Sequence, residues 1–119
     1  MEFSKHHTWA KIEGNIATIG ITDYAQKQLK DIVFIELPKI KTNAKQNKPL
    51  AKIESLKSVS DIISPLSGEI LEVNELLNNE PELINKDPYG KGWIFKLKIK
   101  NEEEIKNLLT KEEYEKSTT

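Results

Sequence analysis

The chain contains no cysteine and no arginine, and it has no long apolar run. The absence of cysteine excludes disulfides, thiolate catalysis and cysteine metal sites. Because all 18 basic residues are lysine, no guanidinium is available for bidentate binding of phosphate or carboxylate. No segment approaches membrane-spanning length, and no charged-then-apolar signal stretch begins the chain. We therefore expect a soluble, cytoplasmic protein that does not enter a membrane.

Aromatic content and net charge are also low. Aromatics make up 7% and hydrophobic residues 37% of the 119 residues, so the core should be thin and mainly aliphatic. A net charge of −1 argues against general attraction to nucleic acid or to anionic membranes. The length suits one domain, and neither a repeat nor an interior linker divides the chain. We expect a single domain over residues 1–119.

The apolar pattern favours short β-strands over most of the chain. Residues 9–12 and 16–21 are predicted to form a hairpin, because Gly14 between them tolerates a positive φ. Residues 32–35 are predicted to form a buried strand. The clearest strand runs over residues 93–100, where three lysines alternate with Trp93, Phe95, Leu97 and Ile99.

Short helices are predicted beside these strands. Thr22 offers an N-cap for a helix over residues 24–29. Asn101 is predicted to begin a C-terminal helix in which Glu104 has capping-box spacing. The apolar stripe of this helix would be Ile105, Leu108 and Leu109. The lysine-rich residues 39–48 are expected to be a polar connection without core residues.

One lysine lies between two short strand-like runs in the middle of the chain. Residues 49–55 and 61–64 would form the arms of a hairpin with Lys57 at its tip, where an enzyme could reach the amine. A surface lysine alone is usually no more than a solvated charge. Apolar anchoring of the turn from beneath is expected from Leu56 and Val59.

Further support for this turn is expected from polar neighbours. Bonds to local backbone donors are expected from Ser58, Ser60 and Asp61. The other residues assigned to support of the turn are Glu54, Ser55 and Gly68, the last of which turns the chain into the next strand, residues 69–73. In that strand, Ile70 and Glu72 are expected to face away from Leu71 and Val73.

The segment around Lys57 resembles the lipoyl-lysine segment of the glycine cleavage system H protein family. The resemblance runs from about Phe3 to Tyr114, and its most specific blocks are residues 17–26, 31–38, 54–61, 68–74 and 85–93. Family members carry lipoate in amide linkage on the lysine that corresponds to Lys57. The resemblance implies a mainly β fold, a flattened β-sandwich of the lipoyl hybrid-motif type, with small flanking helices and a C-terminal helix.

The resemblance also implies a carrier rather than an enzyme. In such systems the lipoyl group accepts an aminomethyl group from glycine as the P protein, a glycine decarboxylase, releases carbon dioxide. The T protein, an aminomethyltransferase, passes the one-carbon unit to tetrahydrofolate, and the L protein, a dihydrolipoyl dehydrogenase, reoxidises the arm. Lipoylating enzymes attach the cofactor. The arm would reach on the order of 14 Å, and a monomer is expected because the arm must visit several partners in turn.

The sequence departs from the family pattern where the loaded arm would be sheltered. His7-Thr8-Trp9 stands where the family has a His-Glu-Trp run, and threonine cannot offer a carboxylate to a cationic aminomethyl nitrogen. Weaker protection of the loaded group is therefore predicted. Lys30 and Lys41 replace common glycines, whereas Asp61 retains the family aspartate. The candidates for the arm cleft are His7, Thr8, Asp61 and Trp93, although Trp93 is first expected in the core.

Other functions remain open on the sequence alone. The chain could be an H-like lipoyl carrier for protein lipoate assembly or for sulfur metabolism, or an unmodified β scaffold for binding. A biotin carrier is disfavoured, because Leu56 and Ser58 flank Lys57 where biotinyl lysines have methionines. His6 and His7 are not expected to bind a metal, because adjacent side chains of a strand point in different directions. No catalytic set of residues can be assigned.

Overall fold

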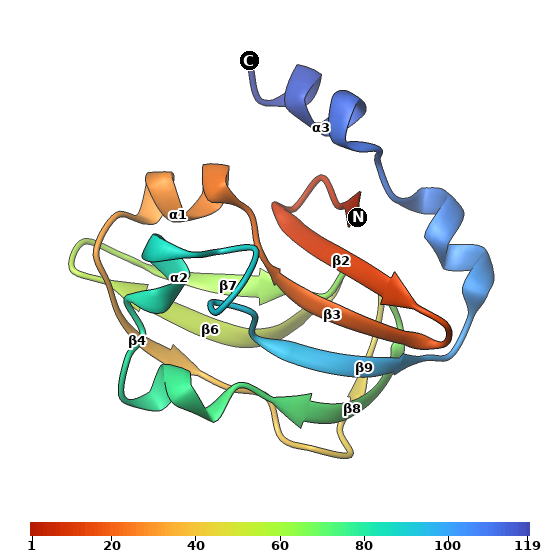
Figure 1. Cartoon of the computed structure of the whole chain (residues 1–119), viewed down its shortest axis with the longest axis horizontal. Coiled ribbons are helices and arrows are strands. Elements are labelled where there is room, and N and C mark those ends of the chain that lie inside the picture. Colours follow the sequence, from red (N-terminus) through yellow and green to blue (C-terminus); the bar gives the residue numbers. More distant parts are fainter.

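Two antiparallel sheets form a flattened body whose principal extents are 37 × 35 × 22 Å (Figure 1). The computed structural model describes residues 1–119. Eighteen buried residues from both sheets and from the segments that cover them form one aliphatic core. Ile19 and Leu97 of one sheet and Ile53 and Ile62 of the other belong to this core and are at most 1% exposed. The predicted flattened, mainly β fold is confirmed.

The larger sheet has the strand order β1-β2-β3-β9-β8-β5. In chain order its strands are β1 (Glu2–Phe3), β2 (Thr8–Glu13), β3 (Ile16–Ile21), β5 (Asn43–Ala44), β8 (Gly68–Val73) and β9 (Phe95–Ile99). The hairpin between β2 and β3 turns at Gly14, whose φ of 64° is one that glycine adopts without strain. The predicted alternation is confirmed over β9, where Phe95, Leu97 and Ile99 are all buried, but it does not extend to Trp93, which precedes the strand and is only half-buried.

The smaller sheet has the order β4-β6-β7 and carries the hairpin that was predicted around Lys57. Its strands are β4 (Ile32–Glu36), β6 (Pro49–Ser55) and β7 (Val59–Ile63). The prediction that residues 32–35 are buried throughout is wrong. Val33 and Phe34 are 47% and 52% exposed, because β4 is an edge strand with one outer face and a register shift after Ile32.

Five short helical segments surround the sheets. They are α1 (Asp23–Leu29), the 3₁₀ helix η1 (Glu75–Asn78), α2 (Leu83–Lys86), the 3₁₀ helix η2 (Glu102–Asn107) and α3 (Lys111–Ser117). Thr22 caps α1 as predicted, because its hydroxyl accepts a hydrogen bond from the Ala25 amide. No helix is both long and apolar enough to cross a lipid bilayer.

The predicted C-terminal helix exists, but it is interrupted. The Asn101 side chain caps η2, yet the capping box predicted with Glu104 is absent, because Glu104 accepts hydrogen bonds from the Ser67 amide and hydroxyl, both at 2.8 Å. The helix ends before Leu109, which instead exchanges two backbone hydrogen bonds with Phe3. A complete capping box begins α3, formed by Thr110 and Glu113.

Two further predictions about strands are corrected by the structure. Residues 39–48 are not merely a polar connection, because β5 pairs with β8 and buries Ala44. In β8 a register shift between Ile70 and Glu72 breaks the expected alternation. Ile70 is buried and Val73 packs against the core, so these two residues face inward together.

Candidate functional site

Lys57 lies at the exposed tip of the β6–β7 hairpin, as the sequence predicts. The strands remain paired up to Glu54 and Val59, and the Ser55 amide donates to the Ser58 carbonyl at 2.9 Å. Lys57 takes part in none of the ion pairs of the protein. The ladder therefore fixes the backbone of the turn while the amine remains free.

The Ser55 hydroxyl is the internal support of this turn. Ser55 is buried, and its hydroxyl accepts hydrogen bonds from the Lys57 amide at 3.3 Å and from the Ser58 amide at 3.2 Å. The expectation that Ser58, Ser60 and Asp61 would bond local backbone donors is wrong, because none of their side chains accepts such a bond. Among the predicted turn residues, Ser55 alone has this role.

The other predicted supports of the turn lie elsewhere or face solvent. Leu56 and Val59 are 73% and 61% exposed, so they do not anchor the turn from beneath. Glu54 is exposed and makes no side-chain hydrogen bond. Gly68 belongs to β8 in the larger sheet, where a Cβ atom would collide with the Lys98 carbonyl oxygen, so it serves close packing between strands.

A cleft of about 290 Å³ lies beside the hairpin, between β7, α1 and the segment before β2. Its lining residues are His6, His7, Thr8, Ile21, Tyr24, Ala25, Gln28, Leu29, Ile53, Ser60, Asp61 and Ile62. Asp61 is the only carboxylate among them. Asp61 lies four positions after Lys57 in the chain, so the backbone between them spans at most about 13 Å at the usual strand rise. An arm of about 14 Å on Lys57 could therefore reach into the cleft.

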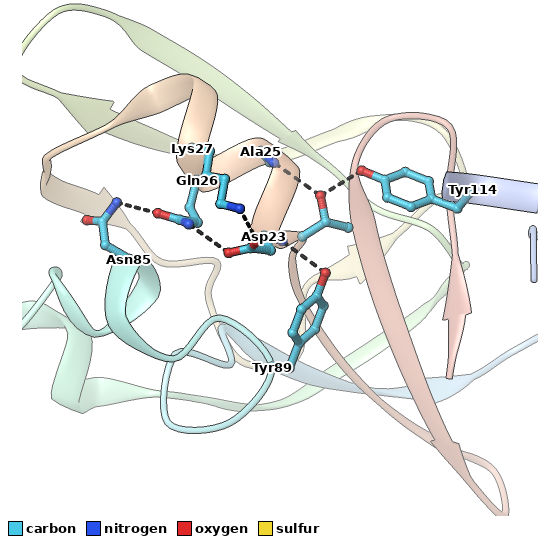
Figure 2. A network of polar contacts seen from close by, with 8 residues as sticks. Asp23, Ala25, Gln26, Lys27, Asn85, Tyr89 and Tyr114 are labelled. Carbon is cyan, nitrogen blue, oxygen red and sulfur yellow. Dashed lines mark hydrogen bonds and ion pairs between the residues drawn. The ribbon is translucent and has the colours of Figure 1, made fainter. Parts of the chain in front are cut away.

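Helix α1 is held as one wall of this cleft by amide side chains. Gln26 donates to Asp23 at 2.8 Å, and Asn85 of α2 donates to Gln26 at 2.9 Å (Figure 2). Asn85 also donates to the Lys30 carbonyl. The pKa of Asp23 is lowered, chiefly by its bond to Lys27 and then by its bond to Gln26. The two short helices are thus joined by polar contacts at the end of α1.

Only three of the four residues predicted to line the arm cleft do so. His7, Thr8 and Asp61 line the cleft together, whereas Trp93 does not. The Trp93 ring packs against the small cluster of Phe3, Trp9 and Tyr114. Trp93 is only half-buried, so it covers the edge of this cluster rather than belonging to the buried core.

Thr8 is part of the floor of the cleft rather than a free polar group. Thr8 is 1% exposed. Its hydroxyl donates a hydrogen bond to the Ile63 carbonyl at 3.1 Å and shares one with the Ser4 hydroxyl at 2.7 Å. The Thr8 proton is therefore already used within the protein. Asp61 remains the only negative charge that this wall offers.

His7 contributes an imidazole to the cleft from a strained backbone position with a φ of 67°. Its Nδ1 atom forms a 2.7 Å hydrogen bond with the Tyr114 hydroxyl of α3, and its ring lies 4.8 Å from that of Tyr24. Burial, and secondarily the charge of His6, lower the pKa of His7. Sequence reasoning missed Tyr24 and Tyr114, which come from two separate helices and share no local pattern with His7.

The family model for the glycine cleavage H-protein matches residues 1–119. The chain belongs to the glycine cleavage H-protein family. Members of this H-protein family are carrier subunits.

Individual H proteins agree with this assignment. The chain is 58% identical over 114 residues to a probable glycine cleavage system H protein 1 of Sulfolobus acidocaldarius, covering 92% of this chain and 83% of the relative. It is 48% identical to the H protein of Thermotoga maritima, over 96% and 92% of the two chains. The crystal structure of a Mycobacterium marinum H protein superposes with a TM-score of 0.88 at 34% identity, over 98% and 94% of the chains.

Proposed function

We propose that this H-protein family member is the lipoyl carrier of a glycine cleavage system, with lipoate in amide linkage on Lys57. The observation that carries the proposal is the free, exposed Lys57 amine on a firmly paired hairpin, one arm's length from a cleft. These residues fit the cofactor, because an attaching enzyme can reach the amine and nothing in the protein competes for it.

The lipoyl group, when attached, would supply a dithiolane that accepts the aminomethyl group and is later reoxidised. The protein's own residues would position and protect this arm. Ile21, Leu29 and Ile62 give the cleft apolar walls that exclude water. The Asp61 carboxylate is exposed at the cleft and would attract a cationic amine with the modest strength that surrounding water allows.

The carrier would catalyse no step itself. Its partners would be the P, T and L proteins and the lipoylating enzymes, and we place it with them in the cytoplasm as a monomer. Each partner must meet the same arm, so contacts with any one of them would be transient.

Intact-mass measurement on protein from its native host tests the attachment. We expect a mass increment equal to one lipoyl group, which is lost in Lys57→Arg. Lys52→Arg is the matched control. Lys52 is also an exposed lysine of this hairpin, but it lies within the paired strands and not at the tip. An increment that survives in Lys57→Arg, or unmodified wild-type protein, would contradict the proposal.

Reconstitution with P, T and L proteins tests the pathway. Glycine-dependent exchange of carbon dioxide should require lipoylated wild-type protein and fall to background with Lys57→Arg. The buried Thr8 in place of the family glutamate favours one alternative, a lipoyl carrier for lipoate assembly or sulfur metabolism. Full lipoylation without any exchange would select that alternative.

A further inference from the structure

A chain of hydrogen bonds, called here the hydrogen-bond line, connects α1 to the cleft through Tyr114 of α3. The Ala25 amide donates to the Thr22 hydroxyl at 3.2 Å, and this hydroxyl shares a 2.7 Å hydrogen bond with Tyr114. Figure 2 shows Ala25 and Tyr114 converging on the hydroxyl between them. Tyr114 in turn shares a 2.7 Å bond with His7 Nδ1.

The direction of this line follows from the proton on Thr22. Thr22 is fully buried at 0% exposure, and its hydroxyl has only the Ala25 amide and Tyr114 as partners. The amide can only donate, so the Thr22 proton must go to the Tyr114 oxygen, since an unpaired buried hydroxyl is costly. The single Tyr114 proton must then go to His7 Nδ1.

Protonation of His7 would reverse the line. A charged imidazole would donate from Nδ1 to the Tyr114 oxygen, so the two hydroxyls would have only one acceptor left between them and either the Tyr114 or the Thr22 proton would be unpaired. The other titratable groups around the imidazole are His6 in its own segment, Tyr24 on α1 and Asp61 on β7 across the same cleft. The hydrogen-bond line therefore opposes a charge on His7 independently of burial.

We infer that His7 is a positioning residue that Tyr114 holds as the neutral Nε2–H tautomer, so that the cleft receives one N–H donor and no positive charge. Nε2 has no hydrogen-bond partner within the protein, and His7 lines the cleft. The donor suits a group that accepts a hydrogen bond, such as the amide carbonyl of a tethered acyl arm. This part of the inference rests on the proposed function, and it leaves any ammonium group to Asp61.

Nitrogen NMR of protein labelled in its histidine rings tests the tautomer without any cofactor. The chain has 2 histidines, so His6→Gln assigns the spectrum. We expect the Nε2–H tautomer for His7 in the unlipoylated protein. In Tyr114→Phe the proton-binding constant of His7 should rise on the order of tenfold, because protonation no longer strands a hydroxyl proton.

A second pair of variants separates this role from simple packing. Thr22→Val should leave the titration near that of the wild type, because the Tyr114 proton then has His7 Nδ1 as its only acceptor and protonation of His7 would leave that proton unpaired. Thr22→Ser keeps the hydroxyl and should also match the wild type, so Tyr114→Phe alone should raise the proton-binding constant. An Nδ1–H tautomer in the wild type, or titration that is unchanged in Tyr114→Phe, would overturn the inference.

The acceptor is tested by comparing bare and lipoylated protein. The His7 Nε2 resonance should shift when Lys57 carries the arm, and the shift should shrink in Tyr114→Phe. An Nε2 resonance that is identical with and without the arm would overturn the assignment of the acceptor. If Lys57 could not be lipoylated at all, the proposed function would fail, while the spectra of the bare protein would still decide the tautomer.

Discussion

Lys30 ends α1 in a backbone conformation that glycine adopts far more readily. Its φ and ψ are 63° and −136°, outside the regions that side chains with a Cβ favour. The amide of Lys30 donates to the Gln26 carbonyl at 2.8 Å, and its own carbonyl accepts from Asn85 at 2.6 Å. These bonds hold the residue in place against local strain.

Lys30→Gly should therefore stabilise the protein. Relief of backbone strain contributes about 1–3 kcal/mol, and the greater freedom of glycine in the unfolded chain opposes it by up to about 1 kcal/mol. We expect a net gain of about 1 kcal/mol in the free energy of unfolding, measured with urea. Lys30→Ala is the control, because it removes the charge but keeps the Cβ atom; an equal gain in Lys30→Ala would contradict the strain argument.

The residues of the site were only partly predictable. The hairpin that carries Lys57 and Asp61 could be predicted because its pattern is local, whereas the roles proposed for the two residues came from the family resemblance. Substitution of common glycines by Lys30 and Lys41 was visible in the sequence, and both residues have a positive φ, 63° and 74°. The role of Tyr114 was not predictable, because its bond to His7 joins residues 107 positions apart.

At the scale of elements, the β6–β7 turn depends on one buried hydroxyl. Ser55 is the acceptor for two amides of the turn, those of Lys57 and Ser58. Both bonds are longer than 3 Å, so each should contribute only modestly. The proposed attachment site thus combines a firmly paired strand ladder with a turn whose own hydrogen bonds are weaker.

Ser55→Ala should loosen the turn without unfolding the sheet. Loss of about 1 kcal/mol of local stability would speed amide hydrogen exchange at Lys57 and Ser58 by roughly fivefold. Ser60→Ala, on the same hairpin, is the control, since its hydroxyl makes no hydrogen bond. Unchanged exchange at both amides in Ser55→Ala would show that Ser55 does not hold the turn.

Elements were predictable where their pattern was local and regular. Strand β9 was recognised because its alternation has no interruption, whereas β5 has two residues and depends on pairing with β8. The predicted C-terminal helix was too long, because Leu109 is not helical and pairs with Phe3 near the other end of the chain. The spacing of Thr110 and Glu113 did mark the start of α3 and could have been used.

At the scale of the whole molecule, β1 and α3, near the two ends of the chain, lie against each other close to the start of α1. Figure 1 shows α3 above the N-terminal segment. Phe3 stacks on Tyr114 at 5.0 Å, and Tyr89 lies edge-on to Phe3. Four titratable groups at this junction have a shifted pKa, namely His7, Asp23, Tyr89 and Tyr114. Burial is the leading cause for all of them except Asp23.

We propose that the chain unfolds as a single domain, so that titration at this junction changes the stability of the whole molecule. Burial raises the pKa of Tyr89 and of Tyr114 above 10.0. The folded state then keeps protons that the unfolded chain releases, so stability is lost as pH rises through and above that value. A urea series from neutral to strongly alkaline pH should show this decline, and Tyr114→Phe should reduce it.

On the acid side the sign is set by His7. Its pKa in the folded state is lowered from 6.5, so the unfolded chain binds a proton first as the pH falls. The free energy of unfolding should therefore decline from about pH 7 downward until His7 is itself protonated in the folded state, before Asp23 adds a further decline below 3.8. His7→Asn should flatten the first decline, because asparagine does not titrate and tolerates the positive φ of this position. His6→Gln should retain most of that decline, since burial, and not the charge of His6, is the larger cause of the lowered His7 pKa. If the free energy of unfolding falls equally with pH in His7→Asn and in the wild type, the acid sensitivity belongs to other groups.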